Sequence, residues 1–126
     1  MQGKQPRVLH VDGDSRVEEE VTRLLSSVCA DCDISVVDRG QKAIEMFRSK
    51  PFDLVILDAW IQAGNGFEIC RKIRETDKNV PIIFYAILAG QTAKGFAERA
   101  GATAFHTSES PADFIDSVSR ALNVKK

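Results

Sequence analysis

The chain carries little net charge and no long hydrophobic run. Its 126 residues hold 17 Lys and Arg against 18 Asp and Glu, a formal net charge of -1, with no long basic stretch. A nucleic-acid-binding surface needs such a basic footprint, so we expect no nucleic-acid partner for this chain. No apolar run approaches the roughly 18 to 20 residues that cross a bilayer, and the polar N-terminal segment MQGKQPR lacks a signal core. We therefore expect a soluble cytoplasmic protein without a membrane partner.

Cysteine is scarce, since only Cys29, Cys32 and Cys70 occur. An odd number of cysteines favours reduced thiols in a cytosol over a disulfide framework. Cys29 and Cys32 have C-x-x-C spacing, but they follow a helical pattern, and the negative end of a helix dipole opposes thiolate formation. A zinc site would need two more ligands, and Cys70, His10 and His106 show no second paired spacing. We therefore expect structural, reduced cysteines that behave as small buried side chains.

What the sequence does have is a regular alternation of short apolar runs and amphipathic segments. Strands are expected at residues 7–12, 33–38, 52–58, 80–88 and 102–107, and helices at 15–28, 40–50, 66–76, 91–100 and 110–124. Parallel strands need crossover connections, which are right-handed almost without exception. With 44% hydrophobic residues, the pattern predicts one α/β domain over residues 1–126, a doubly wound parallel sheet with helices on both faces.

Residues at the helix ends support these boundaries. Ser15, with Glu18 three residues later, forms a capping-box pattern at the start of the first helix. Gly101 is expected to end the fourth helix, and Ser110 with Pro111 to begin the last. The helices are thus indicated by their ends as well as by their hydrophobic faces.

Two aspartates stand at the ends of apolar strands. Asp12 ends the first expected strand and Asp58 ends the third. In an open α/β sheet the binding crevice forms beyond the carboxyl ends of the strands, where the strand order reverses, so both carboxylates should converge there. Mg²⁺ prefers oxygen ligands and often uses one or two carboxylates plus waters. The pair therefore predicts a cation site, with solvated strand ends as the alternative.

The order, spacing and motifs of these segments resemble those of the response regulator receiver domain, the CheY-like, flavodoxin-like module of two-component signalling. The resemblance is carried by RVLHVDGDS, FDLVILDAWIQAGNGFEIC, VPIIFYA and GATAFHT, and it covers about residues 6–123. The glycine that follows the phosphoacceptor strand in the family falls on Gly66. The resemblance implies five helices around a five-stranded sheet of order 2-1-3-4-5.

The resemblance also implies a phosphorelay function. Asp58 would accept a phosphoryl group from a sensor histidine kinase or a phosphotransfer protein, and an output protein or domain would receive the signal. Asp12, Asp58 and the backbone carbonyl of Trp60 would hold Mg²⁺. The chain would be a signalling phosphoacceptor, not an enzyme, with catalysis limited to phosphoryl transfer onto Asp58. The fourth helix, fifth strand and fifth helix would form the face that contacts partners or a second copy in a homodimer.

Several positions depart from the family pattern. Gly13 stands where a second metal-binding acid is usual, and Asp14 either bends into the pocket at this glycine or sits near the start of the following helix. Ala86 replaces the hydroxyl residue that ends the fourth strand, and Ser108 replaces the lysine that ends the fifth. The aromatic switch position is Phe105, which has no hydroxyl.

These departures weaken the expected chemistry. The charge-assisted hydrogen bond of the missing lysine is worth roughly 1.5–3 kcal/mol, enough to slow phosphorylation about tenfold or more. We therefore expect weak Mg²⁺ binding and sluggish phosphorylation. The alternative is a phosphorylation-independent pseudo-receiver that acts as a protein-protein interaction module. Flavin binding is excluded because no hydroxyl- and glycine-rich phosphate loop follows the first strand.

The side chains of four aromatic residues and one histidine allow more than one interpretation. Trp60, beside the expected cleft, either marks a partner site or packs locally. Phe96, Phe105 and Phe114 lie in the segments of the family's contact face, but their periodicity is more typical of core residues. His10 lies inside the first strand and is expected in the core or on a face of the sheet.

Overall fold

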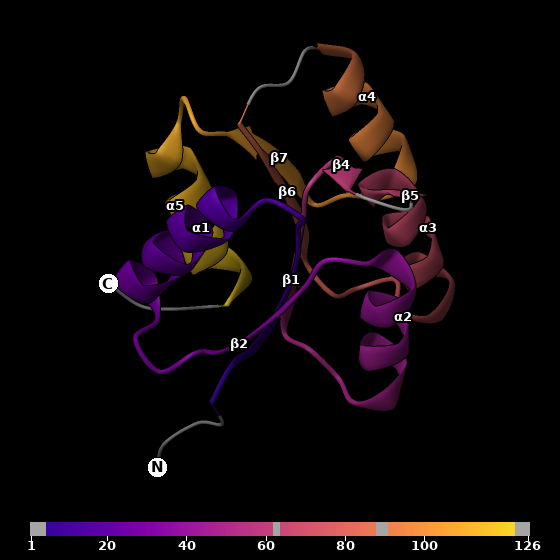
Figure 1. Ribbon diagram of the computed structural model, residues 1–126, viewed down its shortest axis with the longest axis horizontal. Helices are drawn as coiled ribbons and strands as arrows, with labels where there is room; N and C mark the ends of the chain where they lie inside the picture. Colours follow the sequence, from indigo (N-terminus) through magenta and orange to yellow (C-terminus); the bar gives the residue numbers. More distant parts are fainter. Residues whose placement is uncertain (1–4, 62–63, 88–90, 123–126) are drawn as a thin grey trace.

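The computed structural model describes residues 5–61, 64–87 and 91–122 (Figure 1). The central sheet has five parallel strands in the order β2-β1-β3-β6-β7, namely β1 (Arg7–Val11), β2 (Asp33–Val37), β3 (Leu54–Leu57), β6 (Ile82–Ala86) and β7 (Ala104–Thr107). The helices are α1 (Ser15–Val28), α2 (Gly40–Ser49), α3 (Gly66–Thr76), α4 (Gln91–Ala100) and α5 (Pro111–Ala121). The predicted flavodoxin-like fold and its strand order are confirmed.

Helices cover both faces of this sheet. α1 and α5 lie together on one face, and α2, α3 and α4 lie on the other (Figure 1). Successive side chains of a strand point to opposite faces, so each central strand contributes to both cores. In β1, for example, Leu9 and Val11 pack in the core under α2, α3 and α4, whereas Val8 packs under α1 and α5. Within the described part of the chain, no helix is long and apolar enough to cross a membrane.

The helix ends agree with the prediction except at α1. Gly101 follows α4 with a φ of 103°, in the left-handed region that favours glycine. The prediction of Ser15 as the cap of α1 is wrong by one residue. Asp14 is the N-cap, with an extended backbone, and its side chain accepts a hydrogen bond from the backbone N–H of Arg16. The cap falls earlier because Asp14 has both the backbone conformation and the side-chain oxygen that capping requires.

A short hairpin between β3 and α3 is a feature that the sequence does not predict. β4 (Trp60–Ile61) pairs antiparallel with β5 (Gly64–Asn65). Strands of two residues are too short to show the alternation by which longer strands are predicted. Asn65 caps α3 by accepting a hydrogen bond from the backbone N–H of Glu68 at 2.9 Å. The hairpin therefore joins the end of β3 directly to a capped helix.

The prediction of reduced thiols is wrong for Cys29 and Cys32, which form a disulfide with their Cα atoms 5.4 Å apart. Cys29 is the C-cap of α1, where the chain leaves the helix, and this turn brings Cys32 within bridging distance. A count of cysteines carries no information about such proximity. Cys70 is buried and free of any disulfide within the described chain, as predicted, and burial raises the pKa of its thiol to about 11.

Arg74 of α3 forms hydrogen bonds with two loops at the amino ends of the strands. Its Nε donates a hydrogen bond to the carbonyl of Gly101 at 2.9 Å, after α4. Its Nη1 donates to the carbonyls of Asp77 and Val80, at 3.2 and 2.7 Å, in the loop before β6. A guanidinium group holds several acceptors in fixed geometry. Arg74 thus fixes two loops at the edge of the sheet opposite the carboxyl ends of the strands.

Candidate functional site

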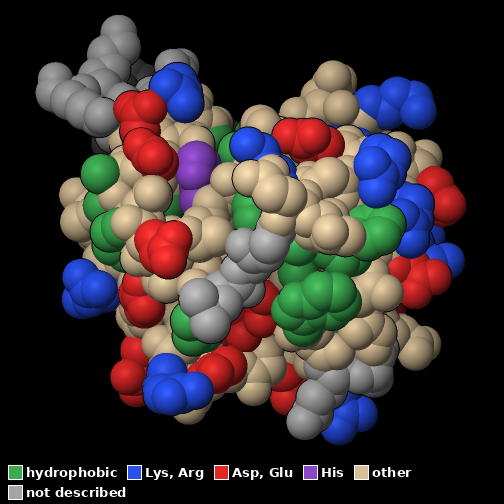
Figure 2. All heavy atoms as spheres, turned by 90° about the horizontal axis from the view of Figure 1, so that it is seen from above, with side chains coloured by type: hydrophobic (Ala, Val, Ile, Leu, Met, Phe, Trp, Pro, Cys, Tyr) green, Lys and Arg blue, Asp and Glu red, His purple; other side chains and the backbone are tan. Residues whose placement is uncertain are grey.

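Asp12 and Asp58 lie at the same edge of the sheet, at the ends of adjacent strands. β1 and β3 pair in parallel with Val11 opposite Leu57, so the next residue of each strand emerges at the carboxyl edge. The backbone N–H of Asp58 also donates to the carbonyl of Val11 at 3.1 Å. Figure 2 looks onto this end of the molecule and shows acidic side chains near the centre, beside a group of exposed hydrophobic side chains. The topology therefore brings the two predicted site carboxylates together.

Asp12 is fully buried, with 0% of its surface exposed. Its Oδ1 accepts a hydrogen bond from the backbone N–H of Asp14 at 2.9 Å. Its Oδ2 lies 3.4 Å from Nε2 of His10 and has no hydrogen-bond partner among the described residues. His10 itself is buried at 1% exposure, so its predicted place in the core is confirmed. A buried carboxylate oxygen without a hydrogen bond is costly, and its chemistry suits a cation.

Asp58 is partly buried and carries a perturbed carboxyl group. The pKa of Asp58 is raised from 3.8 to about 6, first by burial and second by the negative charge of Asp12. Backbone N–H groups of Trp60 and Ala59 act in the opposite direction; that of Trp60 lies 3.4 Å from Oδ1. Two carboxylates that oppose each other's ionisation are the arrangement that a bound cation relieves.

The oxygen donors at this edge fit Mg²⁺ in type. Two carboxylates and a loop carbonyl are ligands that Mg²⁺ prefers, with waters completing its coordination. The sequence predicts that Asp14 either bends into the pocket or lies near the start of the following helix, and the structure places it at the start of α1. There its carboxylate pairs with the guanidinium of Arg16 at 3.2 Å, and this hydrogen-bonded contact lowers the pKa of Asp14. Among the described residues no three His, Cys, Asp or Glu side chains form a metal cluster, so the protein supplies few ligands.

Gly66, at the start of α3, lies against the backbone of Asp58. A Cβ at this position would be 2.2 Å from the carbonyl oxygen of Asp58 and 2.9 Å from the ring of Phe84. The backbone N–H of Gly66 donates to the carbonyl of Ala59 at 3.0 Å, which closes the loop. Gly13 is different, because a Cβ there would meet no described atom within 4 Å. Of these two glycines, Gly66 is therefore the one that has no room for a Cβ.

At the carboxyl ends of β6 and β7, the contacts are hydrogen bonds between uncharged groups and a stack of aromatic rings. Ala86 ends β6, and its carbonyl accepts a hydrogen bond from the backbone N–H of Ser108 at 2.9 Å. The Ser108 hydroxyl donates to the carbonyl of Ile87 at 3.0 Å. Phe105 of β7 is partly buried and stacks on Phe84, with ring centroids 6.1 Å apart. Ser108 thus joins the two strand ends and supplies no positive charge.

The aromatic residues near the site divide between surface and core. Trp60 is 62% exposed and packs edge-on against Phe67, which confirms local packing, while a partner site at Trp60 stays a prediction. Phe96 of α4 is 44% exposed and also contacts Phe67, so the prediction of a core position is wrong for this residue. Phe114 is fully buried, as predicted. Phe105 lies between these extremes. Periodicity places Phe96 on the inner half of α4 but does not show that Phe67 already fills the space beneath it.

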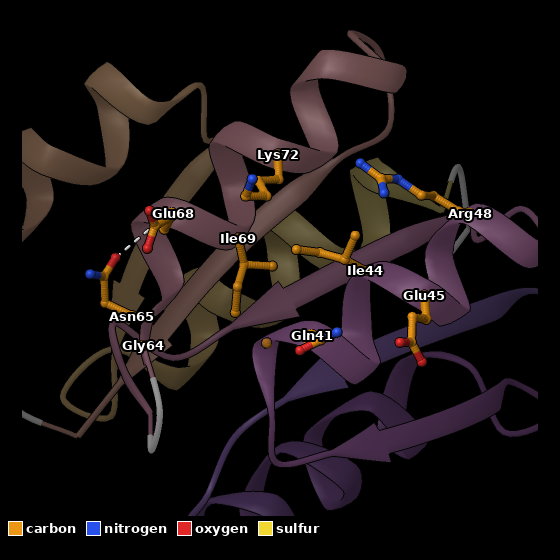
Figure 3. Close-up of a pocket in the computed structure, with 10 residues that line it drawn as sticks. Gln41, Ile44, Glu45, Arg48, Gly64, Asn65, Glu68, Ile69 and Lys72 are labelled. Carbon is orange, nitrogen blue, oxygen red and sulfur yellow. Dashed lines mark hydrogen bonds between the residues drawn. The ribbon is translucent and has the colours of Figure 1, made fainter.

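A separate cavity of about 460 Å³ lies between α2 and α3 (Figure 3). Ile44 and Ile69 point toward one another across it, and the charged side chains around it are Glu45, Arg48, Glu68 and Lys72. Sequence reasoning misses this cavity because its lining comes from two helices and forms no motif. It includes neither Asp12 nor Asp58, so it is not part of the acidic site, although it reaches the hairpin at Gly64.

Comparisons with known proteins agree with this geometry. The family model described as response regulator receiver domain matches residues 8–113. Response regulator MprA of Mycolicibacterium vanbaalenii is 32% identical over 77 residues, which are 61% of this chain and 32% of that protein. The chain thus spans about a third of the length of the first curated relatives that it matches.

Solved structures share the fold over almost the whole chain. A two-component response regulator from Clostridium difficile has a TM-score of 0.82 at 21% identity, covering 94% of this chain and 97% of its own. The receiver domain of the sensor histidine kinase PA1611 from Pseudomonas aeruginosa, with a magnesium ion coordinated in its active site cleft, has a TM-score of 0.82 at 19% identity, covering 95% and 99%. Because the family model covers most of its sequence, this chain belongs to the response regulator receiver domain family.

Proposed function

We propose that this chain is a single receiver domain of a two-component phosphorelay in the cytoplasm, in which Asp58 accepts a phosphoryl group from a sensor histidine kinase or a phosphotransfer protein. The observation that carries the proposal is the pairing of Asp58 with the buried Asp12 at the ends of adjacent strands. Membership of the receiver family supports the signalling role. The acceptor is Asp58 rather than Asp12 because Asp58 is the more accessible of the two.

In the proposed step, a carboxylate oxygen of Asp58 attacks the phosphorus of a phosphohistidine. A P–O bond forms and the P–N bond breaks, and the leaving imidazole keeps the electron pair and takes up a proton from solvent. The product is an acyl phosphate on Asp58. Phosphoryl transfer depends mainly on positioning and on neutralisation of charge. Since its pKa is about 6, Asp58 is ionised at neutral pH and available as the nucleophile.

Asp12, Asp58 and the backbone carbonyl of Trp60 are the proposed ligands of Mg²⁺. Bound there, the ion would neutralise negative charge on the phosphoryl oxygens during transfer. The hydrogen-bond-free Oδ2 of Asp12 and the raised pKa of Asp58 support a cation at this place. We propose that binding is weak, because Gly13 supplies no carboxylate and Asp14 caps α1. The magnesium-bound receiver domain of PA1611 is a precedent for a cation in this fold.

The output side of the proposal concerns the face formed by α4, β7 and α5. Phe96 of α4 is 44% exposed, on the side of the helix that contacts Phe67 of α3, and is the candidate contact for an output protein, an output domain or a second copy of the chain. The neutral residues Ala86 and Ser108 contribute no charge to a phosphoryl group, so we propose slow phosphorylation and an altered switch. The activity is self-modification, not turnover of a separate substrate.

The test is incubation of the purified chain with acetyl phosphate or phosphoramidate, with and without Mg²⁺, followed by intact mass measurement. We expect a Mg²⁺-dependent gain of one phosphoryl mass in the wild type and its loss in Asp58→Ala. The matched control is Asp38→Ala, which removes an exposed acid just after β2 and should leave the adduct unchanged. Absence of an adduct, or an adduct that persists in Asp58→Ala, would contradict the proposal and direct attention to phosphorylation-independent binding.

A further inference from the structure

We infer that His10 is a positioning residue that holds the Asp12 carboxylate and thereby lowers the affinity of the acidic pair for Mg²⁺. The inference rests on the proposed function, in which Asp12 is a ligand of the cation. It concerns a residue to which the resemblance assigns no role in phosphotransfer, and it follows from the surroundings of one buried side chain.

His10 occupies a place where packing alone favours an apolar residue. It is the fourth of the five residues of β1, an interior strand of the sheet, opposite Val36 of β2 and Ile56 of β3, and is 1% exposed. Its Nδ1 has no hydrogen-bond partner among the residues that the structure describes. A buried polar atom without a partner destabilises the fold, whereas leucine or valine would not. The imidazole at this position therefore needs an explanation other than core packing.

The other ring nitrogen provides that explanation. Nε2 of His10 lies 3.4 Å from Oδ2 of Asp12, and the two residues share a face of β1 because they are two positions apart. The contact is longer than a hydrogen bond, but with the ring proton on Nε2 it attracts the carboxylate in surroundings of low dielectric constant. Oδ1 of Asp12 is held by the backbone N–H of Asp14 at 2.9 Å. Oδ1 of Asp12 thus has a hydrogen bond, and Oδ2 has only the longer contact with the ring of His10.

A cation at the acidic pair would compete with His10 for Asp12. If Mg²⁺ bound through Oδ2, the contact of this oxygen with the His10 ring would be lost or weakened. His10 therefore stabilises the cation-free form of the pair more than the cation-bound form. Removal of the His10 N–H should therefore raise the affinity of Asp12 and Asp58 for Mg²⁺.

The experiment compares Mg²⁺ binding in the wild type with three variants. His10→Leu removes the donor and keeps an apolar side chain of similar size, while His10→Gln keeps an N–H donor at a similar reach. His106→Leu is the matched control, because it replaces the other histidine of the chain, which lies in the edge strand β7 and bonds to Ser117 of α5. Mg²⁺ dissociation constants are measured by isothermal titration calorimetry and by the fluorescence of Trp60, the single tryptophan. Thermal melting of each variant checks that it is folded.

We expect His10→Leu to lower the Mg²⁺ dissociation constant about three- to tenfold, and His10→Gln and His106→Leu to bind like the wild type. An unchanged or raised constant in His10→Leu overturns the inference but leaves the proposed function standing if the wild type binds Mg²⁺. An equal gain in His10→Gln or in His106→Leu also overturns it, because the effect would then not depend on this N–H. If His10→Leu binds Mg²⁺ and the wild type does not, the result supports the inference and contradicts a Mg²⁺-assisted function for the native chain. If neither protein binds Mg²⁺, both the inference and the Mg²⁺-assisted function are overturned.

Discussion

The two halves of the carboxyl edge of the sheet differ in charge. At the ends of β1 and β3, Asp12 and Asp58 bring two carboxylates together, one of them buried without a full set of hydrogen bonds. At the ends of β6 and β7, Ala86 and Ser108 are neutral and bond to the backbone of neighbouring strands. The first half carries the carboxylates proposed as nucleophile and cation ligands, and the second supplies no positive charge beside them. The two parts of such a site are thus separable within one fold.

The largest effect is expected from disturbing the backbone that supports the first half. Gly66→Ala places a Cβ 2.2 Å from the carbonyl oxygen of Asp58, so the loop or the helix must move. We expect a loss of about 2–4 kcal/mol in the free energy of unfolding, measured by urea denaturation. Gly13→Ala is the control, because the space there is open, and should change stability by less than about 0.5 kcal/mol. Equal effects of the two substitutions would show that the close approach at Gly66 is unimportant.

The second prediction restores charge to the second half. Ser108→Lys should raise the rate of phosphorylation by acetyl phosphate about tenfold or more, because an ammonium group near the acidic pair can form charge-assisted hydrogen bonds with the phosphoryl oxygens. The rate is followed by intact mass over time. Ser108→Met, which has a long side chain without charge, serves as the control. If Ser108→Met accelerates the reaction as much as Ser108→Lys, charge is not what this half lacks.

The third prediction concerns repulsion within the first half. The pKa of Asp58 is about 6 in the folded chain and 3.8 ordinarily. Between these pH values the folded state binds more protons than the unfolded state, so the free energy of unfolding falls as pH rises and stays lower above the window. Asp58→Asn should therefore stabilise the metal-free protein by about 1–2 kcal/mol near neutral pH, after allowance for solvent screening, and by almost nothing at about pH 4.

Urea denaturation in the presence of EDTA, repeated across this pH range, measures the difference between Asp58→Asn and the wild type. Asp53→Asn is a control at the other end of β3, although Asp53 accepts a hydrogen bond from the backbone N–H of Arg7 and its loss carries a cost of its own. A gain for Asp58→Asn that does not change with pH would show that the ionisation of Asp58, opposed by burial and by the charge of Asp12, is not its source.

The smallest predicted effect comes from adding a ligand to the first half. A side chain at Gly13 meets no described atom within 4 Å at its Cβ, so Gly13→Asp can add a carboxylate without a clash. We expect Mg²⁺ to bind about three- to tenfold more tightly, because a third carboxylate joins the two already present. Calorimetric titration gives the constant, with Gly13→Asn as the neutral control. Tighter binding by both variants would point to the backbone, not to the added charge.

Much of this arrangement could be predicted from the sequence, because the strands and helices repeat their hydrophobic periods clearly. The topology of parallel strands then places Asp12 and Asp58 together, since both follow apolar runs. The Asp14 cap, the disulfide between Cys29 and Cys32 and the contact of His10 with Asp12 could not be predicted in this way. Each depends on local backbone geometry or on a distance between side chains, which hydrophobic pattern and composition do not contain. The hairpin at Trp60 is missed because it is too short to have a period.

Arg74 has a consequence for how this protein can change through evolution. Its hydrogen bonds to Asp77, Val80 and Gly101 hold loops at the amino edge of the sheet, away from the carboxylates. Substitutions of side chains at the carboxyl edge therefore leave these hydrogen bonds intact, and positions with open space, such as Gly13, can change without disturbing them. The amino edge can thus maintain the fold while the chemistry of the opposite edge varies, except where the backbone is closely packed, as at Gly66.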